Sequence, residues 1–282
     1  MPKRQLRPPG MATGDVVVVT GASRGIGAEV CRRFSTIGCN VGLIARDGEM
    51  LAAVAATLSS PSHAAVADVT DSVALARAVN DITDALGAIA VLVNNAGHGS
   101  WTAVVDTEAA EFRRAIDVNY LGVVATTSLV LPEMLERRRG HIINISSIAG
   151  RIGAPFEAAY SASKFAVVGF SEALAIEVAG TGVDVSMIHP GPVETEFAAQ
   201  RARPAPRRSP KPVAVEAVGD AVMSTVRRPR PNRYVPAWLG LATAARTIVP
   251  RAYRFGTSRL FASERRQLRQ RFADDSGLDS DA

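Results

Sequence analysis

Six short apolar runs recur along the first two thirds of the chain. Each is continuous rather than alternating between apolar and polar positions. Strands of a parallel sheet have this pattern, because helices cover both of their faces. The runs therefore predict six parallel strands, at residues 16–20, 41–45, 63–67, 90–94, 141–146 and 183–189.

Segments with helical spacing separate these runs. Asp71 and Thr107 stand where helix N-caps belong, and Gly38, Gly87 and Gly140 stand where C-caps belong. Alternating strands and helices predict an α/β fold, a Rossmann-type doubly wound parallel sheet in three α/β/α layers. The expected helices cover residues 28–38, 49–58, 71–86, 108–139 and 157–178.

We expect a single catalytic domain over residues 14–236, preceded by a disordered segment at 1–13. Regularity ends near Phe197, and the stretch that follows is rich in Arg, Pro and Ala. A loop is expected at about 194–212. Its position after the sixth strand suits a lid over a ligand pocket, and a plain connector is the alternative.

Residues 237–282 are expected to form a basic helical extension with an acidic, disordered end. Helical spacing is broken at Pro250, and arginines are interleaved with the apolar residues. Two interpretations stay open: the extension packs on its own body or a sister subunit, or it lies on an anionic membrane. The apolar set is Trp238, Leu241, Ala245, Ile248, Tyr253, Phe255, Leu260 and Phe261.

Charge is segregated along a chain whose net charge is +5. Residues 14–200 carry 12 basic and 20 acidic side chains, whereas residues 201–282 carry 17 and 7. A basic last third attracts an acidic partner, an anionic lipid or nucleic acid. Since the body itself is acidic, we expect no nucleic-acid partner.

The remaining bulk features favour a cytoplasmic protein, with peripheral membrane contact left open. Cys31 and Cys39 are the only cysteines and do not suggest a disulfide framework. No apolar run has the length of a membrane span, and the N-terminus lacks the core of a secretory signal, although Met11 is an alternative start. The four histidines have no metal-ligand spacing, so no metal is expected.

A glycine-rich turn, TGASRGIG, follows the first run and leads into a helix. Gly21, Gly25 and Gly27 leave the backbone open, so that its N–H groups can approach a pyrophosphate. Alone, the turn is weak evidence, and a tight connection without a ligand is the alternative. A second small-residue turn, NNAG at 94–97, follows the fourth run, which lies beside the first in a doubly wound order.

The segment YSASK places Tyr160 and Lys164 four positions apart on one helix face. Of the 32 Lys and Arg residues only three are Lys, and the other two lie outside the predicted core, at Lys3 and Lys211. Because Arg is used nearly everywhere else, a lone Lys indicates a site that needs a compact ammonium group. An ammonium near a tyrosine lowers the tyrosine pKa from about 10 toward neutral pH.

Together with Asn119, Ser147 and HPGPVET at 189–195, these motifs resemble the single-domain short-chain dehydrogenases/reductases. The resemblance covers roughly residues 14–236. It implies that Tyr160 is the acid/base, that Lys164 tunes it and holds the nicotinamide ribose, and that Ser147 binds the substrate oxygen. It also implies that Asn119 holds a water linking Lys164 to solvent.

The implied cofactor is a nicotinamide dinucleotide. Asp68 would accept from the adenine amino group, with Val69 beside the ring. The strand end VGLIARD has Ala45 at the usual acidic position and Arg46 next, which with Arg24 favours the 2′-phosphate of NADP(H). Asp47 keeps NAD(H) possible. The full cofactor set is Gly21, Ser23, Arg24, Gly25, Ile26, Gly27, Arg46, Asp68, Val69, Asn95, Ala96, Gly97, Tyr160, Lys164, Pro190, Gly191, Val193 and Thr195.

The expected activity interconverts a carbonyl and an alcohol, with a lipophilic small molecule as substrate. His98, Trp101, Phe156 and Phe197 are candidates for the substrate pocket, and a homodimer or homotetramer is expected. The direction of the reaction stays open. Two other functions stay open as well: a catalytically silent nucleotide sensor, and a membrane-associated protein that acts through its basic tail.

Overall fold

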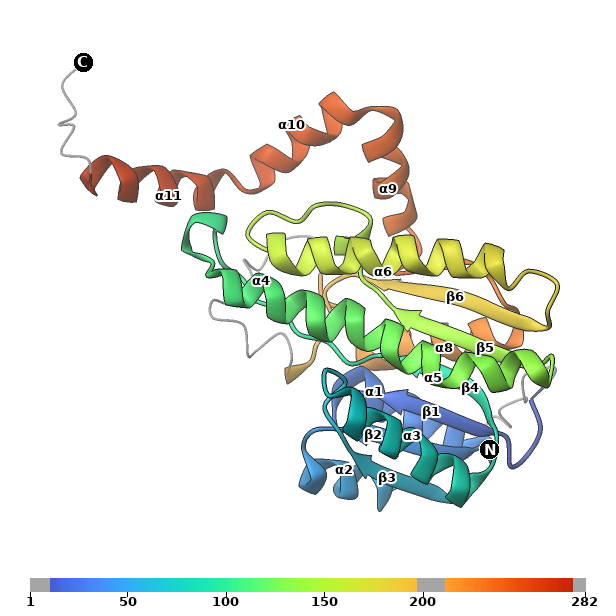
Figure 1. Ribbon diagram of the computed structural model, residues 1–282. Coiled ribbons are helices and arrows are strands. Elements are labelled where there is room, and N and C mark those ends of the chain that lie inside the picture. The colour runs from blue at the N-terminus through green and yellow to red at the C-terminus, as the bar shows by residue number, and fades with distance from the viewer. Residues whose placement is uncertain (1–10, 197–210, 276–282) are drawn as a thin grey trace, which may run out of the picture.

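The computed structural model describes residues 11–196 and 211–275 of the chain. Its centre is a seven-stranded sheet in the order β3-β2-β1-β4-β5-β6-β7, and every neighbouring pair is parallel. The doubly wound sheet predicted from the sequence is therefore confirmed (Figure 1). The strands are β1 (Val16–Thr20), β2 (Asn40–Ala45), β3 (Ser62–Val66), β4 (Ile89–Asn94), β5 (Gly140–Ile145), β6 (Val183–Pro190) and β7 (Asn232–Val235).

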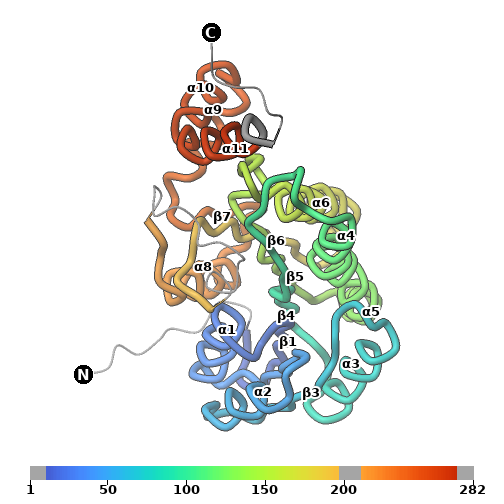
Figure 2. Tube along the Cα trace, turned by 90° about the vertical axis from the view of Figure 1, so that its left-hand side faces the viewer, coloured from blue at the N-terminus to red at the C-terminus, as the bar shows by residue number. Residues whose placement is uncertain are grey.

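Helices cover both faces of the sheet, which gives the three layers (Figure 2). Successive residues of β1 serve opposite cores: Val17 packs with α1, α2 and α8, whereas Val18 packs with α3, α5 and α6. This explains why the apolar runs are continuous. The helices are α1 (Gly25–Thr36), α2 (Gly48–Ala55), α3 (Ser72–Leu86), α4 (Ala109–Ile116), α5 (Gly122–Glu136), α6 (Ala158–Glu177) and α8 (Val215–Arg227).

The sequence pattern missed two elements of the body. The prediction that regularity ends near Phe197 is wrong, because α8 packs against α1 and β7 extends the sheet beside β6. The segment NRYV of β7 is short and half polar, and pairing with β6 makes it a strand. Phe197 itself and most of the expected loop lie outside the described residues.

Two of the predicted helix ends are also wrong. Thr107 does not cap α4: Glu108 occupies that position, and the Thr107 hydroxyl donates to the carbonyl of Ala103 at 2.8 Å. Gly140 opens β5, and Arg138 takes the left-handed conformation before it, with φ 53°. Asp71 does cap α3, since its carboxylate accepts from the amides of Val73 and Ala74.

The predicted long helix at 108–139 is interrupted by a π-helical turn, η2 (Asp117–Leu121), between α4 and α5. By length and hydropathy the continuous segment Ala109–Glu136 is the one membrane-span candidate among the described residues. Such a helix is common in the core of a globular protein. Here Val123, Val130 and Met134 are buried, and α5 packs on the sheet.

After β7 the chain leaves the three layers as three helices, α9 (Leu239–Ile248), α10 (Pro250–Leu260) and α11 (Ala262–Asp275). We call these helices the arm. Figures 1 and 2 both show the arm beyond α6, outside the sandwich. Pro250 stands at the first turn of α10, where its missing N–H costs no hydrogen bond.

Candidate active site

A cleft of about 1270 Å³ lies at the carboxyl ends of β1, β4, β5 and β6. This is the edge at which doubly wound sheets bind ligands. The cleft is lined by the glycine-rich turn, by the segment after β4, and by residues of α6 and the arm. It brings together most of the residues singled out from the sequence.

The glycine-rich turn needs its glycines for two different reasons. Gly21 and Gly25 have positive φ angles of 65° and 54°, a region that side chains disfavour. Gly27 does not line the cleft, but a Cβ there would lie 2.2 Å from the carbonyl oxygen of Gly21. Gly27 therefore lets α1 pack close to the turn, whereas Gly25 itself lines the cleft.

Asn95 holds the glycine-rich turn against β4. Its amide donates to the carbonyls of Thr20 and Gly21, both at 3.0 Å. The hydroxyl of Thr20 in turn accepts from the backbone amides of Asn95 and Ala96. The two motifs thus form one hydrogen-bonded wall of the cleft, with Gly97 next along it.

At the end of β2 the cleft is bordered by one cation and two carboxylates. Arg46 is exposed and lies 3.6 Å from Asp68. Asp68 is also tied to Thr70, whose amide and hydroxyl both donate to it. Asp47 caps α2 by accepting from the amide of Met50 at 3.0 Å. One oxygen of Asp47 is therefore already used, whereas the guanidinium of Arg46 reaches toward solvent.

Lys164 is buried within the cleft wall. Its ammonium donates to the carbonyl of Ile145 at 2.9 Å and lies 5.8 Å from the centre of the Tyr160 ring. Burial lowers the pKa of Lys164 from 10.5 to about 8. Both side chains project from the same side of α6, as their spacing predicts.

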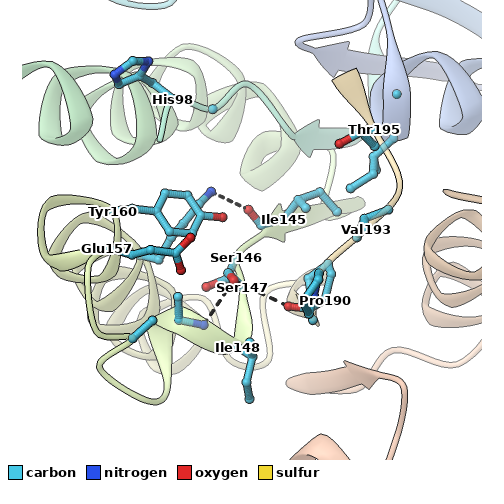
Figure 3. Close-up of a pocket in the computed structure, with 18 of the residues that line it drawn as sticks. His98, Ile145, Ser146, Ser147, Ile148, Glu157, Tyr160, Pro190, Val193 and Thr195 are labelled. Atoms are coloured by element: carbon cyan, nitrogen blue, oxygen red, sulfur yellow. Dashed lines mark hydrogen bonds between the residues drawn. The ribbon is translucent and has the colours of Figure 1, made fainter. Parts of the chain in front are cut away.

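Ser147 faces Tyr160 from the end of β5 (Figure 3). Its hydroxyl accepts from the amide of Ala149 at 3.1 Å and donates to the carbonyl of Pro190 at 3.5 Å. These contacts orient the oxygen toward the cleft. Ser146, the neighbouring serine, also lines the cleft.

Asn119 lies behind the cleft wall, in the π-helical turn, and is fully buried. Its side-chain oxygen accepts from the amide of His98, and its nitrogen donates to the carbonyl of His98 and to the hydroxyl of Ser163. The amide therefore fastens the segment after β4 to α6. A π-helical turn also leaves backbone carbonyls without their usual helical partners, which is common at functional sites.

The residues expected to form the substrate pocket separate into three groups. His98 and Trp101 line the cleft, although the imidazole of His98 turns toward α4 and bonds to Glu111 at 2.8 Å (Figure 3). Phe156 stands behind Trp101, with ring centres 5.7 Å apart, and has a positive φ of 65°. Phe197 lies outside the described residues.

Two contributions to the cleft were missed by the sequence interpretation. Glu157 is nearly buried, lines the cleft and lies beside Tyr160 (Figure 3). Its position three residues before Tyr160, on the same helix face, was an available signal. The second contribution comes from the arm. No local sequence pattern indicates which part of the body the arm faces. Its lining residues are Leu239, Ala242, Tyr253, Thr257, Leu260 and Phe261.

The remaining predicted cofactor residues also border the cleft. They come from the glycine-rich turn, from the segment after β3 and from the segment after β6. They are Ser23, Arg24, Ile26, Val69, Gly191, Val193 and Thr195.

Comparison with known proteins finds a family model, described as short chain dehydrogenase, that matches residues 15–205. A bovine (Bos taurus) protein called dehydrogenase/reductase SDR family member 7B is 38% identical over 191 residues, which are 64% of this chain and 59% of that protein. A 3-ketodihydrosphingosine reductase of Bacteroides thetaiotaomicron is 39% identical over 187 residues, 66% of each chain. This chain therefore matches only part of the length of these relatives.

Solved structures show the same fold. A variant of actinorhodin polyketide ketoreductase with NADPH is 31% identical, with a TM-score of 0.72 over 82% of this chain and 99% of the other. A protein from Burkholderia phymatum in complex with NAD is 26% identical, with a TM-score of 0.75 over 84% and 95%. Similar proteins have thus been seen with either nicotinamide cofactor.

Proposed function

Because the chain belongs to the short-chain dehydrogenase family of nicotinamide-dependent oxidoreductases, we propose that it interconverts a carbonyl and an alcohol with NADP(H). The observation that carries this proposal is the grouping of Tyr160, Lys164 and Ser147 around one cleft whose other end is a glycine-rich turn. A proton donor, Tyr160, and a turn that can bind the phosphates of a dinucleotide therefore line the same cleft.

The cleft fits a dinucleotide on its own geometry. Side chains at Gly21 or Gly25 would be strained there, and the start of α1 offers its backbone N–H groups to a pyrophosphate. Gly21, Gly25 and Asn95 would form the phosphate end, with Asp68 and Val69 near the adenine. When bound, the nicotinamide supplies or accepts the hydride.

The chain itself would handle the proton. In the reductive direction the Tyr160 hydroxyl donates its proton to the substrate oxygen, and the Lys164 ammonium stabilises the tyrosinate that remains. Ser147 would turn its single hydroxyl proton from the carbonyl of Pro190, a long contact of 3.5 Å, to the same substrate oxygen. Asn119 keeps the segment after β4 in register with α6, and a water held there would link Lys164 to solvent.

NADP(H) is favoured over NAD(H) by the charges at the end of β2. A 2′-phosphate would meet the exposed guanidinium of Arg46, with Arg24 on the glycine-rich turn nearby. NAD(H) selection needs a carboxylate that accepts from the ribose hydroxyls. Asp47 is the candidate, and its role as the cap of α2 already engages one of its oxygens.

The substrate class follows from the walls around Tyr160. This end of the cleft is largely apolar. The body contributes Trp101 and Ile148 to it, and the arm contributes Leu260 and Phe261. Two relatives named above are called reductases of keto compounds, which supports a lipophilic ketone as substrate. We also propose that the protein works as a homodimer or homotetramer.

A substrate panel tests the proposed function. Full-length protein is mixed with NADPH or NADH and with aliphatic, aromatic and long-chain ketones, and the nicotinamide absorbance is followed. We expect oxidation of NADPH that depends on an apolar ketone. Binding of NADPH without turnover on any ketone or alcohol would instead support a nucleotide sensor.

A further inference from the structure

The arm is fastened to the body on one side. Phe261 stacks on Trp101, with ring centres 6.2 Å apart, and packs at a tilt against Phe156, with ring centres 6.4 Å apart. Near the start of the arm, Arg246 donates to the carbonyl of Arg151 at 2.9 Å. These contacts hold α9 and α10 so that one side of each faces the cleft.

The other side of α9 is apolar and faces away from the body. Leu241, Ala244 and Ile248 recur at helical spacing, and the exposed fractions of Leu241 and Ile248 are 73% and 77%. Opposite them, Ala242 lines the cleft and Arg246 bonds to the body. Helices of a globular body normally bury such an aliphatic stripe.

The adjoining α10 combines an exposed aromatic residue with exposed arginines. Phe255 is 59% exposed, and the guanidinium of Arg259 lies 4.4 Å from the centre of its ring. Arg251 and Arg254 are also exposed. From Leu239 to Asp275 the chain carries eight arginines and three acidic residues. The arm therefore has a net positive charge together with an exposed apolar stripe.

We propose that α9 and α10 dock on an anionic lipid surface. Leu241, Ile248 and Phe255 would enter the interface, and Arg251, Arg254 and Arg259 would pair with lipid phosphates. The charge of the arm suits this partner, since each cation near an anionic leaflet adds to the attraction. Basic amphipathic helices lie in the plane of the interface with their apolar side buried.

The rim of the cleft favours a membrane over a second copy of the chain. Trp238 and Leu260 both line the cleft, and both remain about half exposed, at 49% and 50%. An apolar surface thus continues from the cleft to the outside of the arm. A lipid surface would make use of this continuity by giving a lipophilic substrate a path that avoids water. That path rests on the proposed function, whereas the docking does not.

The test is co-sedimentation of full-length protein with vesicles of phosphatidylcholine, with and without phosphatidylglycerol, in the absence of cofactor and substrate. The test variant is Leu241→Ser with Ile248→Ser. The control is Val66→Ser with Val73→Ser, which removes two exposed aliphatic side chains at the β3 edge of the sheet, opposite the β7 edge that leads into the arm. NADPH binding and the oligomeric state are measured for each protein.

We expect wild type and control to bind phosphatidylglycerol vesicles at low salt and to be released as salt rises. The test variant should bind about a hundredfold or more weakly, because burial of each of its two aliphatic side chains contributes about tenfold or more. Absence of binding by wild type, or equal binding by the test variant, overturns the proposal. A test variant that changes its oligomeric state but not its vesicle binding also overturns it and assigns the stripe to a subunit interface. Wild-type protein that binds these vesicles but reduces no ketone in the substrate panel contradicts only the proposed function.

Discussion

The indole ring of Trp101 and the phenyl ring of Phe261 stack with their centres 6.2 Å apart, which joins the segment after β4 to the arm. Both rings line the cleft. This wall of the cleft is therefore assembled from two segments that are remote in sequence.

Phe261→Ala should raise the KM for an apolar ketone by about threefold to tenfold, since an aromatic pair contributes about 0.5–1.5 kcal/mol beyond the area that it buries. The KM for NADPH should not change, because Phe261 is not among the residues assigned to the dinucleotide. Phe255→Ala is the matched control, as Phe255 is exposed and does not line the cleft. Equal effects of the two variants on the KM for the apolar ketone would contradict a wall formed by Phe261.

Arg46→Asp should reverse the cofactor preference. It replaces the exposed cation at the end of β2 by an anion, so that a 2′-phosphate loses a charged hydrogen bond and meets repulsion. We expect kcat/KM for NADPH to fall about a hundredfold or more, at a cost of about 3 kcal/mol. The value for NADH should change little. Wild-type protein that already prefers NADH would contradict this interpretation.

Lys164 should reduce stability at neutral pH, because burial lowers its pKa from 10.5 to about 8. Below about pH 8 the Lys164 side chain carries its proton in both the folded and the unfolded state. The full cost of burying the charged ammonium then lowers the free energy of unfolding. Between about pH 8 and 10.5 only the unfolded state keeps it, so the contribution of Lys164 to the free energy of unfolding rises with pH.

Lys164→Met should therefore abolish turnover and yet raise the free energy of unfolding at pH 7 by about 1–3 kcal/mol, as burial of an uncharged chain avoids this cost. It should also remove the rise in stability between about pH 8 and 10.5. Urea unfolding at pH 7 and at pH 10 measures both effects. A lower free energy of unfolding for the variant at pH 7 would contradict this prediction. It would show that the hydrogen bond to the carbonyl of Ile145 contributes more than desolvation of the ammonium costs.

Glu157 should influence which ketones are accepted, because its carboxylate stands in the cleft wall beside Tyr160. Glu157→Gln keeps the size of the side chain and removes its charge. A charged hydrogen bond contributes about 1.5–3 kcal/mol, so substrates with an amine or hydroxyl near the carbonyl should lose about tenfold or more in kcat/KM. Plain aliphatic ketones should lose much less. A uniform loss across the panel would indicate a role other than substrate selection.

Much of the fold could be predicted because the central strands are buried on both faces. Val17 and Val18 serve different cores, and both must be apolar. The strand β7 could not be predicted, since Asn232–Val235 becomes a strand through its pairing with β6. The predicted helix end at Gly140 was wrong for a similar reason, because the surrounding structure decides which residue ends the helix. Arg138 takes the left-handed conformation that was expected of a glycine.

The candidate site was predictable where local spacing determines geometry. Tyr160 and Lys164 share a helix face, and the glycine-rich turn lies directly after β1. The pocket walls were less predictable, because Phe261 reaches Trp101 only through the path of the arm. The side-chain contacts of Asn119 likewise depend on how α6 meets the segment after β4.

The central claim is that Tyr160 transfers the proton in a nicotinamide-dependent reaction, and Tyr160→Phe tests it most directly. The variant keeps the ring and removes only the hydroxyl. Single-turnover reduction of an active ketone and fluorescence titration with NADPH are measured on the same preparation. We predict that the rate falls by about a hundredfold or more while the dissociation constant for NADPH stays within about threefold, since general acid catalysis contributes about 10²–10⁴ in rate. A variant that reduces the ketone at the wild-type rate would contradict the claim.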